Sequence, residues 1–159
     1  MKNLALIFLM LAIAMPGKLY SQDKRALKAA EMSFNSAESD YKKGNFNEAA
    51  QKFDIVVNSI PAAIDSRKHL EMRLESLIKL IDIRFYKSVN ITQACGYLEL
   101  YESTINTVRN SGVLKSTDLL KYLKQMQEYT QKEATQCAGY ERVGSDMEKF
   151  RKTFDEEMD

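Results

Sequence analysis

The sequence predicts an all-α fold of about six helices arranged as antiparallel hairpins, and three observations lead to that prediction. Only two prolines and six glycines occur in 159 residues, so long stretches lack helix-breaking residues. Apolar residues recur at intervals of three and four along these stretches, which is the period of one helix face. The segments between the periodic stretches are short, and short connections join antiparallel neighbours.

The first two helices are expected at residues 24–43 and 46–60. Gly44 lies between them, where the tolerance of glycine for a left-handed backbone favours a helix end. Asn45 is the expected N-cap of the second helix, and Pro61 marks its end. The apolar faces of these two helices are Leu27, Ala30, Phe34, Ala37 and Tyr41, and Ala49, Phe53, Val56, Val57 and Ile60.

Four further helices are expected, at residues 65–87, 91–110, 117–136 and 146–156. Apolar residues spread widely around the third helix, which predicts that it is the central and most buried one. Asn90 and Ser116 are the expected N-caps of the fourth and fifth helices. Ser145 and Glu148 form an expected capping box for the sixth helix, whose apolar side is Met147, Phe150 and Phe154.

The N-terminus has the pattern of a secretory signal peptide. Lys2 supplies a positive charge, residues 4–15 contain no polar side chain, and Ser21 is a small residue after the break at Pro16. As a helix, the apolar run rises about 18 Å, which is short of a hydrocarbon core of about 30 Å. We therefore expect residues 1–21 to be a signal peptide and 22–159 a single helical domain without a membrane segment, exported to the periplasm or secreted. The alternative is a buried N-terminal core helix.

The charge balance excludes a general attraction to anionic surfaces. Removal of residues 1–21 takes away Lys2 and Lys18 and no acid, which turns the formal net charge from +1 to −1. A near-neutral domain lacks the basic patch that nucleic acids or anionic membranes attract. We expect no nucleic-acid partner.

The sequence offers little material for catalysis or metal binding. His69 is the only histidine, and it follows Arg67 and Lys68 near the start of the third helix, where a solvated side chain is expected. No His-Glu-x-x-His sequence and no glycine-rich phosphate loop occurs. We therefore expect no enzyme, no catalytic residue, no cofactor and no metal site.

Cys95 and Cys137 are the only two cysteines, and an even number in an exported chain favours a disulfide. When the fourth and fifth helices fold back on each other, Cys95 lies opposite about residue 132, and Cys137 follows just beyond at the same end. We expect a structural bridge. The alternative, a redox-active pair, lacks the Cys-x-x-Cys spacing that such pairs use.

An internal repeat relates residues 40–53 to residues 85–98 by a shift of 45 positions. The shift superimposes four identical pairs: Tyr41 and Tyr86, Lys42 and Lys87, Asn45 and Asn90, and Ala49 and Ala94. Small residues such as the two alanines allow helices to approach closely, and the large residue one turn later fills the space beside them.

The first copy resembles the tetratricopeptide repeat (TPR). The residues that carry the resemblance are Gly44, Phe46, Glu48, Ala49, Phe53 and Pro61, at the spacing that this family uses from its inter-helix turn to its terminal proline. The second copy has Val89 and Asn106 where the glycine and the proline are expected, and the period is 45 rather than 34. The resemblance is closest over residues 37–61, and it implies a right-handed superhelix. The alternative is an unrelated helical bundle.

In TPR proteins, the first helix of each repeat lines a concave groove that holds peptide ligands. Through the 45-residue match, the resemblance implies that this groove contains Glu38, Tyr41, Lys42, Tyr86 and Lys87. Alternatively, the tyrosines pack between helices and the lysines are solvated. The expected function is a non-enzymatic exported scaffold or adaptor for a protein or peptide partner. The alternatives are a small structural subunit of a cell-envelope assembly or a thiol-redox protein.

Overall fold

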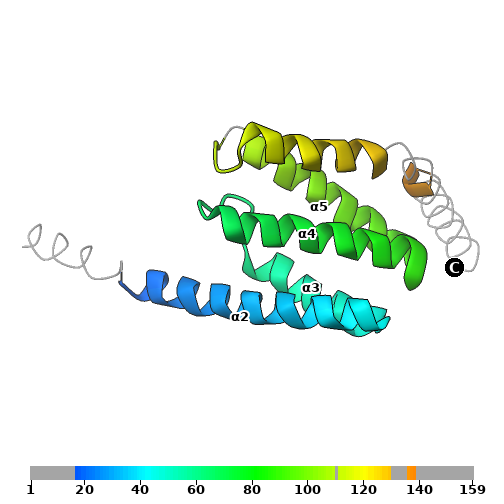
Figure 1. Cartoon of the computed structure of the whole chain (residues 1–159), viewed down its shortest axis with the longest axis horizontal. Helices are drawn as coiled ribbons and strands as arrows, with labels where there is room; N and C mark the ends of the chain where they lie inside the picture. Colours follow the sequence, from blue (N-terminus) through cyan, green and yellow to red (C-terminus); the bar gives the residue numbers. More distant parts are fainter. Residues whose placement is uncertain (1–16, 110, 130–135, 139–159) are drawn as a thin grey trace, which may run out of the picture.

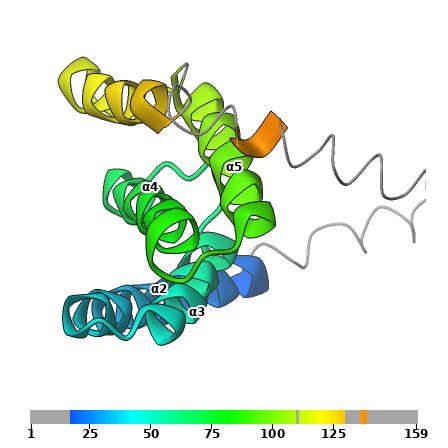
Figure 2. The same cartoon turned by 90° about the vertical axis from the view of Figure 1, so that its right-hand side faces the viewer.

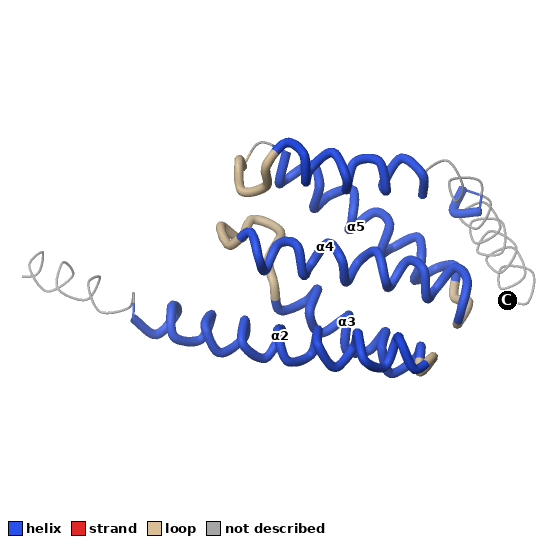
Figure 3. The backbone as a smooth tube through the Cα atoms, viewed as in Figure 1, coloured by secondary structure: helices blue, strands red, loops and turns tan. Residues whose placement is uncertain are grey.

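The computed structural model describes residues 17–109, 111–129 and 136–138, with side chains from residue 24 onward. Every regular element in this part of the chain is a helix, and Figure 3 shows helices joined by loops. The predicted all-α fold is therefore confirmed. Most of the predicted signal peptide and the predicted sixth helix at 146–156 lie outside the described residues.

The helices begin and end close to the predicted positions. They are α2 (Gly17–Lys43), α3 (Phe46–Ser59), α4 (Arg67–Asp82), the π-helix η1 (Ile83–Lys87) and α5 (Ile91–Arg109), and residues 116–129 and 136–138 are also helical. α2 begins earlier than the predicted first helix, so the expected cleavage site after Ser21 falls within α2. The predicted third helix is divided, because its last five residues form η1.

The helices form two layers, which Figures 1 and 2 show from two sides. α2, α4 and residues 116–129 run side by side in the same direction, and we name them the front layer. α3 and α5 run back in the opposite direction behind them and form the back layer. Within the front layer, α4 lies between α2 and residues 116–129. The sides of these three helices that face away from α3 and α5 therefore form one continuous surface.

α4 is the most buried of the described helices, as its broadly apolar sequence predicted. Its side chains Leu70, Leu74, Leu77, Leu80 and Ile81 are all fully buried. Burial of a leucine or isoleucine side chain contributes about 1.5–3 kcal/mol, so this helix dominates the hydrophobic core. The core also includes the repeat-related pair Ala49 and Ala94, both at 0% exposure.

The two copies of the internal repeat turn by different means. Gly44 has a positive φ of 82°, and its N–H donates to the carbonyl of Tyr41, as predicted for a glycine-terminated helix. The second copy has Val89 in its place, and a β-branched residue strongly disfavours that conformation. The chain instead widens into η1, where the N–H of Ser88 donates to the carbonyl of Ile83.

The two asparagine caps also differ. The side chain of Asn90 accepts a hydrogen bond from the N–H of Gln93 at 3.1 Å, which confirms it as the cap of α5. Asn45 is the N-cap residue of α3, as predicted, but its side chain makes no capping hydrogen bond.

Arg73 of α4 is buried in the core at 6% exposure. Its guanidinium donates to the carbonyls of Val57 and Ile60 and to the hydroxyl of Thr104. One side chain therefore joins the end of α3, the middle of α4 and the middle of α5.

Candidate functional site

The residues predicted to line a groove gather where α2 ends and η1 begins. The hydroxyl of Tyr41 donates to Asp82 Oδ2 at 2.5 Å, and Asp82 immediately precedes η1. The ring of Phe46 lies edge-on to Tyr41 with centroids 5.6 Å apart. Lys87 Nζ lies 6.0 Å from the centroid of the same Phe46 ring. Both contacts join residues that are 41 positions apart in sequence, so the two copies of the repeat meet at one end of the molecule.

The five predicted residues differ in how they are exposed. Lys42, Tyr86 and Lys87 are exposed, whereas Glu38 and Tyr41 are half-buried. Lys79 Nζ lies 4.1 Å from the centre of the Tyr41 ring. Burial and then the hydrogen bond to Asp82 raise the pKa of Tyr41 to about 12. For Tyr41, these contacts correspond to the alternative interpretation, in which the tyrosine packs between helices.

Tyr86 differs from its repeat partner, because 48% of its surface is exposed. Its ring is tilted against that of Phe85, with centroids 6.0 Å apart. Tyr86 lies in the π-helix η1 whereas Tyr41 lies in the α-helix α2, so the backbone differs between the two repeat-related tyrosines. The 45-residue match therefore pairs two tyrosines that lie in one neighbourhood but differ in exposure.

Tyr129, the last residue of the helical segment 116–129, belongs to the same neighbourhood. Burial raises its pKa, and the nearby Asp82, Tyr86 and Tyr41 raise it further. Each helix of the front layer thus contributes a tyrosine to this end, with Tyr86 supplied by η1 at the end of α4. We name Tyr41, Tyr86 and Tyr129 the tyrosine cluster.

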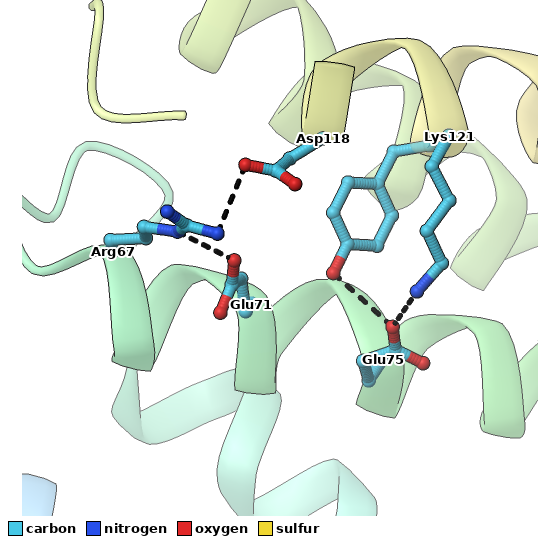
Figure 4. A network of polar contacts seen from close by, with 6 residues as sticks. Arg67, Glu71, Glu75, Asp118 and Lys121 are labelled. Atoms are coloured by element: carbon cyan, nitrogen blue, oxygen red, sulfur yellow. Dashed lines mark hydrogen bonds and ion pairs between the residues drawn. The ribbon is translucent and has the colours of Figure 1, made fainter. Parts of the chain in front are cut away.

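Ion pairs join α4 to residues 116–129 along the rest of the front layer (Figure 4). Arg67 Nη2 lies 2.9 Å from Asp118 Oδ2. Lys121 Nζ lies 2.8 Å from Glu75 Oε1, and the hydroxyl of Tyr122 donates to the same oxygen at 3.2 Å. Because the carboxylate of Glu75 already has two donors, this stretch offers less to a charged partner than the tyrosine cluster does.

The environment of His69 contradicts the predicted solvated side chain. Only 14% of its side chain is exposed, because α2 passes beside the start of α4. His69 Nε2 lies 2.9 Å from Glu31 Oε1, and His69 Nδ1 lies 2.7 Å from Ser66 Oγ. Lys68 Nζ also contacts Glu31 Oε1, at 2.7 Å. The sequence could not indicate this arrangement, because Glu31 is 38 residues away in the chain.

A cavity of about 690 Å³ opens next to His69. It lies between the start of α2, the end of α3 and the loop that leads into α4. Leu27, Pro61 and Ile64 supply apolar surface, and Ser66 and His69 line it with polar groups. No sequence motif marked this cavity, since its wall comes from three separate segments.

Cys95 and Cys137 form a disulfide with their Cα atoms 5.7 Å apart, as predicted from the hairpin geometry. The bridge attaches the first part of α5 to the chain beyond residues 116–129. Because the sequence contains only these two cysteines, the bridge leaves no free thiol.

Within the described residues, no group of three or more histidine, cysteine, aspartate or glutamate side chains is placed to hold a metal ion. None of the helices in this part of the chain combines the length and the apolar character needed to cross a membrane. Comparison with protein-family models, curated proteins and solved structures gives no match to this chain.

Alkaline pH should destabilise the fold, because five buried or half-buried tyrosines have raised pKa values. The pKa rises to about 12 for Tyr41 and Tyr97, and burial also raises it for Tyr101, Tyr122 and Tyr129. A group whose pKa is higher in the folded state stabilises it fully below the unfolded value near 10 and loses that contribution as pH rises. We expect the melting temperature, followed by circular dichroism, to fall steadily from pH 10 to 12.

Tyrosine ionisation, followed by absorbance near 295 nm, should track this loss of helix. Tyr97→Phe removes one hydroxyl with a raised pKa, which donates to Asp54 Oδ1 at 2.9 Å. The melting temperature of this variant should therefore decline less steeply with pH than that of the parent. An unchanged melting temperature up to pH 12 would contradict the expectation.

Proposed function

We propose that the chain is an exported, TPR-like adaptor whose tyrosine cluster binds a peptide segment of a partner protein without catalysis there. The observation that carries the proposal is the exposure of Tyr86, an aromatic side chain that is 48% exposed within a group of otherwise packed tyrosines. Tyrosine offers a large rigid contact area at low entropic cost, and such residues are enriched among interface hot spots.

The arrangement of the helices supports this proposal. In the TPR family, the first helices of successive hairpins lie side by side and form the binding surface. Here α2, α4 and residues 116–129 are the first helices of successive hairpins, and they form the front layer. The tyrosine cluster lies at one end of that layer, so a bound segment would contact all three helices.

The charges near the cluster indicate the kind of segment that fits. Lys42 and Lys43 form the last turn of α2, and Lys87 ends η1; all three side chains are exposed. Asp82, Glu38 and Glu128 are the acids beside these tyrosines, and Asp82 already accepts a hydrogen bond from the hydroxyl of Tyr41. We therefore propose a partner segment that presents carboxylate groups together with apolar side chains.

Export is supported by the apolar N-terminal run and by the disulfide between Cys95 and Cys137. Disulfides persist in the periplasm and outside the cell and are rare in the cytosol. The same bridge weakens the thiol-redox alternative, since both cysteines are engaged.

The distribution of exposed apolar side chains favours an adaptor over a permanently buried subunit. Within the described residues, the large ones are Met32 on α2, Ile55 on α3, Tyr86 in η1, Val89 just after it, and Leu120 in residues 116–129. A permanent assembly interface buries a larger continuous apolar area than side chains scattered over several elements provide.

The test is a crosslinking pull-down from cell envelopes with the protein and with the double variant Tyr86→Ala/Lys87→Ala. Loss of a central aromatic anchor costs about 2 kcal/mol or more, so capture of the partner should fall about 30-fold. Ile55→Ala is the matched control, because Ile55 is also 48% exposed but lies in the back layer.

Tyr41 is best replaced by phenylalanine, since alanine would leave a void between helices. Circular dichroism should show all three variants folded. A partner captured equally by the double variant would contradict the proposal, and a partner lost only with Ile55→Ala would move the binding surface to α3.

A further inference from the structure

Ser66, His69 and Glu31 form a continuous chain of hydrogen bonds between α4 and α2. Ser66 Oγ lies 2.7 Å from His69 Nδ1, and His69 Nε2 lies 2.9 Å from Glu31 Oε1. The imidazole is 14% exposed, so both of its nitrogens are held by these two partners rather than by bulk water. The order is hydroxyl, imidazole, carboxylate.

The two hydrogen-bond partners of His69, a carboxylate and a hydroxyl, determine which nitrogen of the neutral imidazole carries the proton. A carboxylate only accepts hydrogen bonds, so Nε2 carries the proton and donates it to Glu31. Nδ1 then has the free lone pair and accepts the proton of the Ser66 hydroxyl. Hydrogen bonds from Lys68 and His69 lower the pKa of Glu31, which keeps it ionised. This arrangement is that of a nucleophile, a base and an orienting acid.

The chain ends at a cavity where a substrate has room to approach. Ser66 and His69 both line the cavity of about 690 Å³, and Leu27, Pro61 and Ile64 give it apolar walls. Ser66 is the N-cap residue of α4, and its side chain makes no capping hydrogen bond. The N–H groups in the first turn of a helix lack partners within the helix and favour negative charge, so they suit a developing oxyanion.

We propose that Ser66 is a nucleophile for small carboxylic esters with apolar acyl groups, with His69 as general base and Glu31 as the residue that positions His69. This activity goes beyond partner binding at the tyrosine cluster and does not depend on it. The cavity and the cluster involve different residues.

The reaction is an ordinary two-step acyl transfer to water. Ser66 Oγ bonds to the ester carbonyl carbon while its proton passes to His69 Nδ1. The carbon–oxygen bond to the alcohol then breaks, and the alcohol leaves with that proton. A water molecule next gives its proton to His69 and adds to the acyl carbon. The bond to Ser66 Oγ breaks, the serine regains the proton, and the carboxylic acid is released.

Hydrolysis of p-nitrophenyl butyrate by the purified protein tests the activity. Ser66→Ala should reduce the rate to that of buffer, and His69→Gln should lower kcat/KM about 10²- to 10⁴-fold. Glu31→Gln should lower kcat while KM stays within about twofold, because Glu31 acts through His69. Ser39→Ala is the matched control: Ser39 is an exposed serine of α2 that does not line the cavity, and the rate should stay within about twofold.

A fluorophosphonate probe provides a second measurement. Mass spectrometry of the labelled protein should locate the adduct on Ser66, and His69→Gln should abolish labelling while circular dichroism remains helical. If Ser66→Ala hydrolyses the ester as fast as the parent, or if the probe leaves Ser66 unmodified, the proposal is overturned. The three residues then have only a structural role in joining α2 to α4. In that case Ser66→Ala would lower the melting temperature without changing the rate of ester hydrolysis.

Discussion

Arg73→Ala should lower the free energy of unfolding by about 3 kcal/mol or more, one of the largest single-residue effects in this chain. The side chain is 6% exposed, and its three described partners are oxygens of Val57, Ile60 and Thr104, none of them a carboxylate. Burial lowers the pKa of Arg73 from its usual value, but a guanidinium remains charged. Burying a guanidinium without a carboxylate partner is costly unless its N–H groups donate hydrogen bonds to other buried acceptors.

The need for Arg73 arises from Pro61. In a continued helix, the carbonyl of Val57 would accept the N–H of residue 61, but proline has none. Arg73 Nη1 supplies the missing donor and also binds the carbonyl of Ile60 at 2.6 Å. The carbonyl end of a helix carries partial negative charge, so it stabilises a cation there. Removal of Arg73 leaves these carbonyls buried and unpaired.

Urea denaturation of a small variant series measures this contribution. Arg73→Met retains much of the volume without the donors, so its loss should lie between zero and that of Arg73→Ala. Arg109→Ala replaces an exposed arginine at the end of α5 and should change stability by less than about 0.5 kcal/mol. If Arg73→Ala lies within 1 kcal/mol of the parent, the carbonyls find other donors and the argument from Pro61 fails.

Arg73 also shows where sequence reasoning ends. It lies three residues after Leu70 and four before Leu77, directly on the apolar stripe of the third helix. A charged residue at such a position either lies at the edge of the apolar face and reaches solvent, or is buried with a hydrogen-bonding partner from another helix. The choice depends on where the end of α3 comes to lie, and that is a tertiary fact that periodicity does not contain.

The same limit applies to the candidate site. The helices and their turns followed from local signals: Gly44 ends α2, and Asn90 caps α5. The 45-residue repeat correctly brought Tyr41 and Tyr86 to one region. The repeat did not predict η1 or the greater exposure of Tyr86. Val89 stands where the first copy has Gly44, and the turn that follows Tyr86 is therefore built differently. His69 was misjudged because its partner Glu31 comes from another helix.

The pairing of Cys95 with Cys137 was predictable because it depends only on antiparallel helices of known rise. Its expected consequence for stability is large. A bridge across a sequence separation of 42 residues contributes about 4 kcal/mol in the chain-entropy account. The double variant Cys95→Ser/Cys137→Ser should lose about that amount in urea denaturation, a large part of the 5–15 kcal/mol typical of a domain. Replacing both cysteines avoids a free thiol.

The loss should be concentrated in one part of the molecule. The bridge fastens the chain beyond residues 116–129 to α5, whereas α2 and α3 pack on α4 without it. Amide hydrogen exchange in the double variant should therefore accelerate most in residues 116–129, which would open by local unfolding. Dithiothreitol should shift the urea midpoint of the parent and leave that of the double variant unchanged. Two results would show that the bridge does not hold residues 116–129 in place. One is a urea midpoint of the parent that does not change on reduction. The other is exchange in the double variant that accelerates as much in α2 and α3 as in residues 116–129.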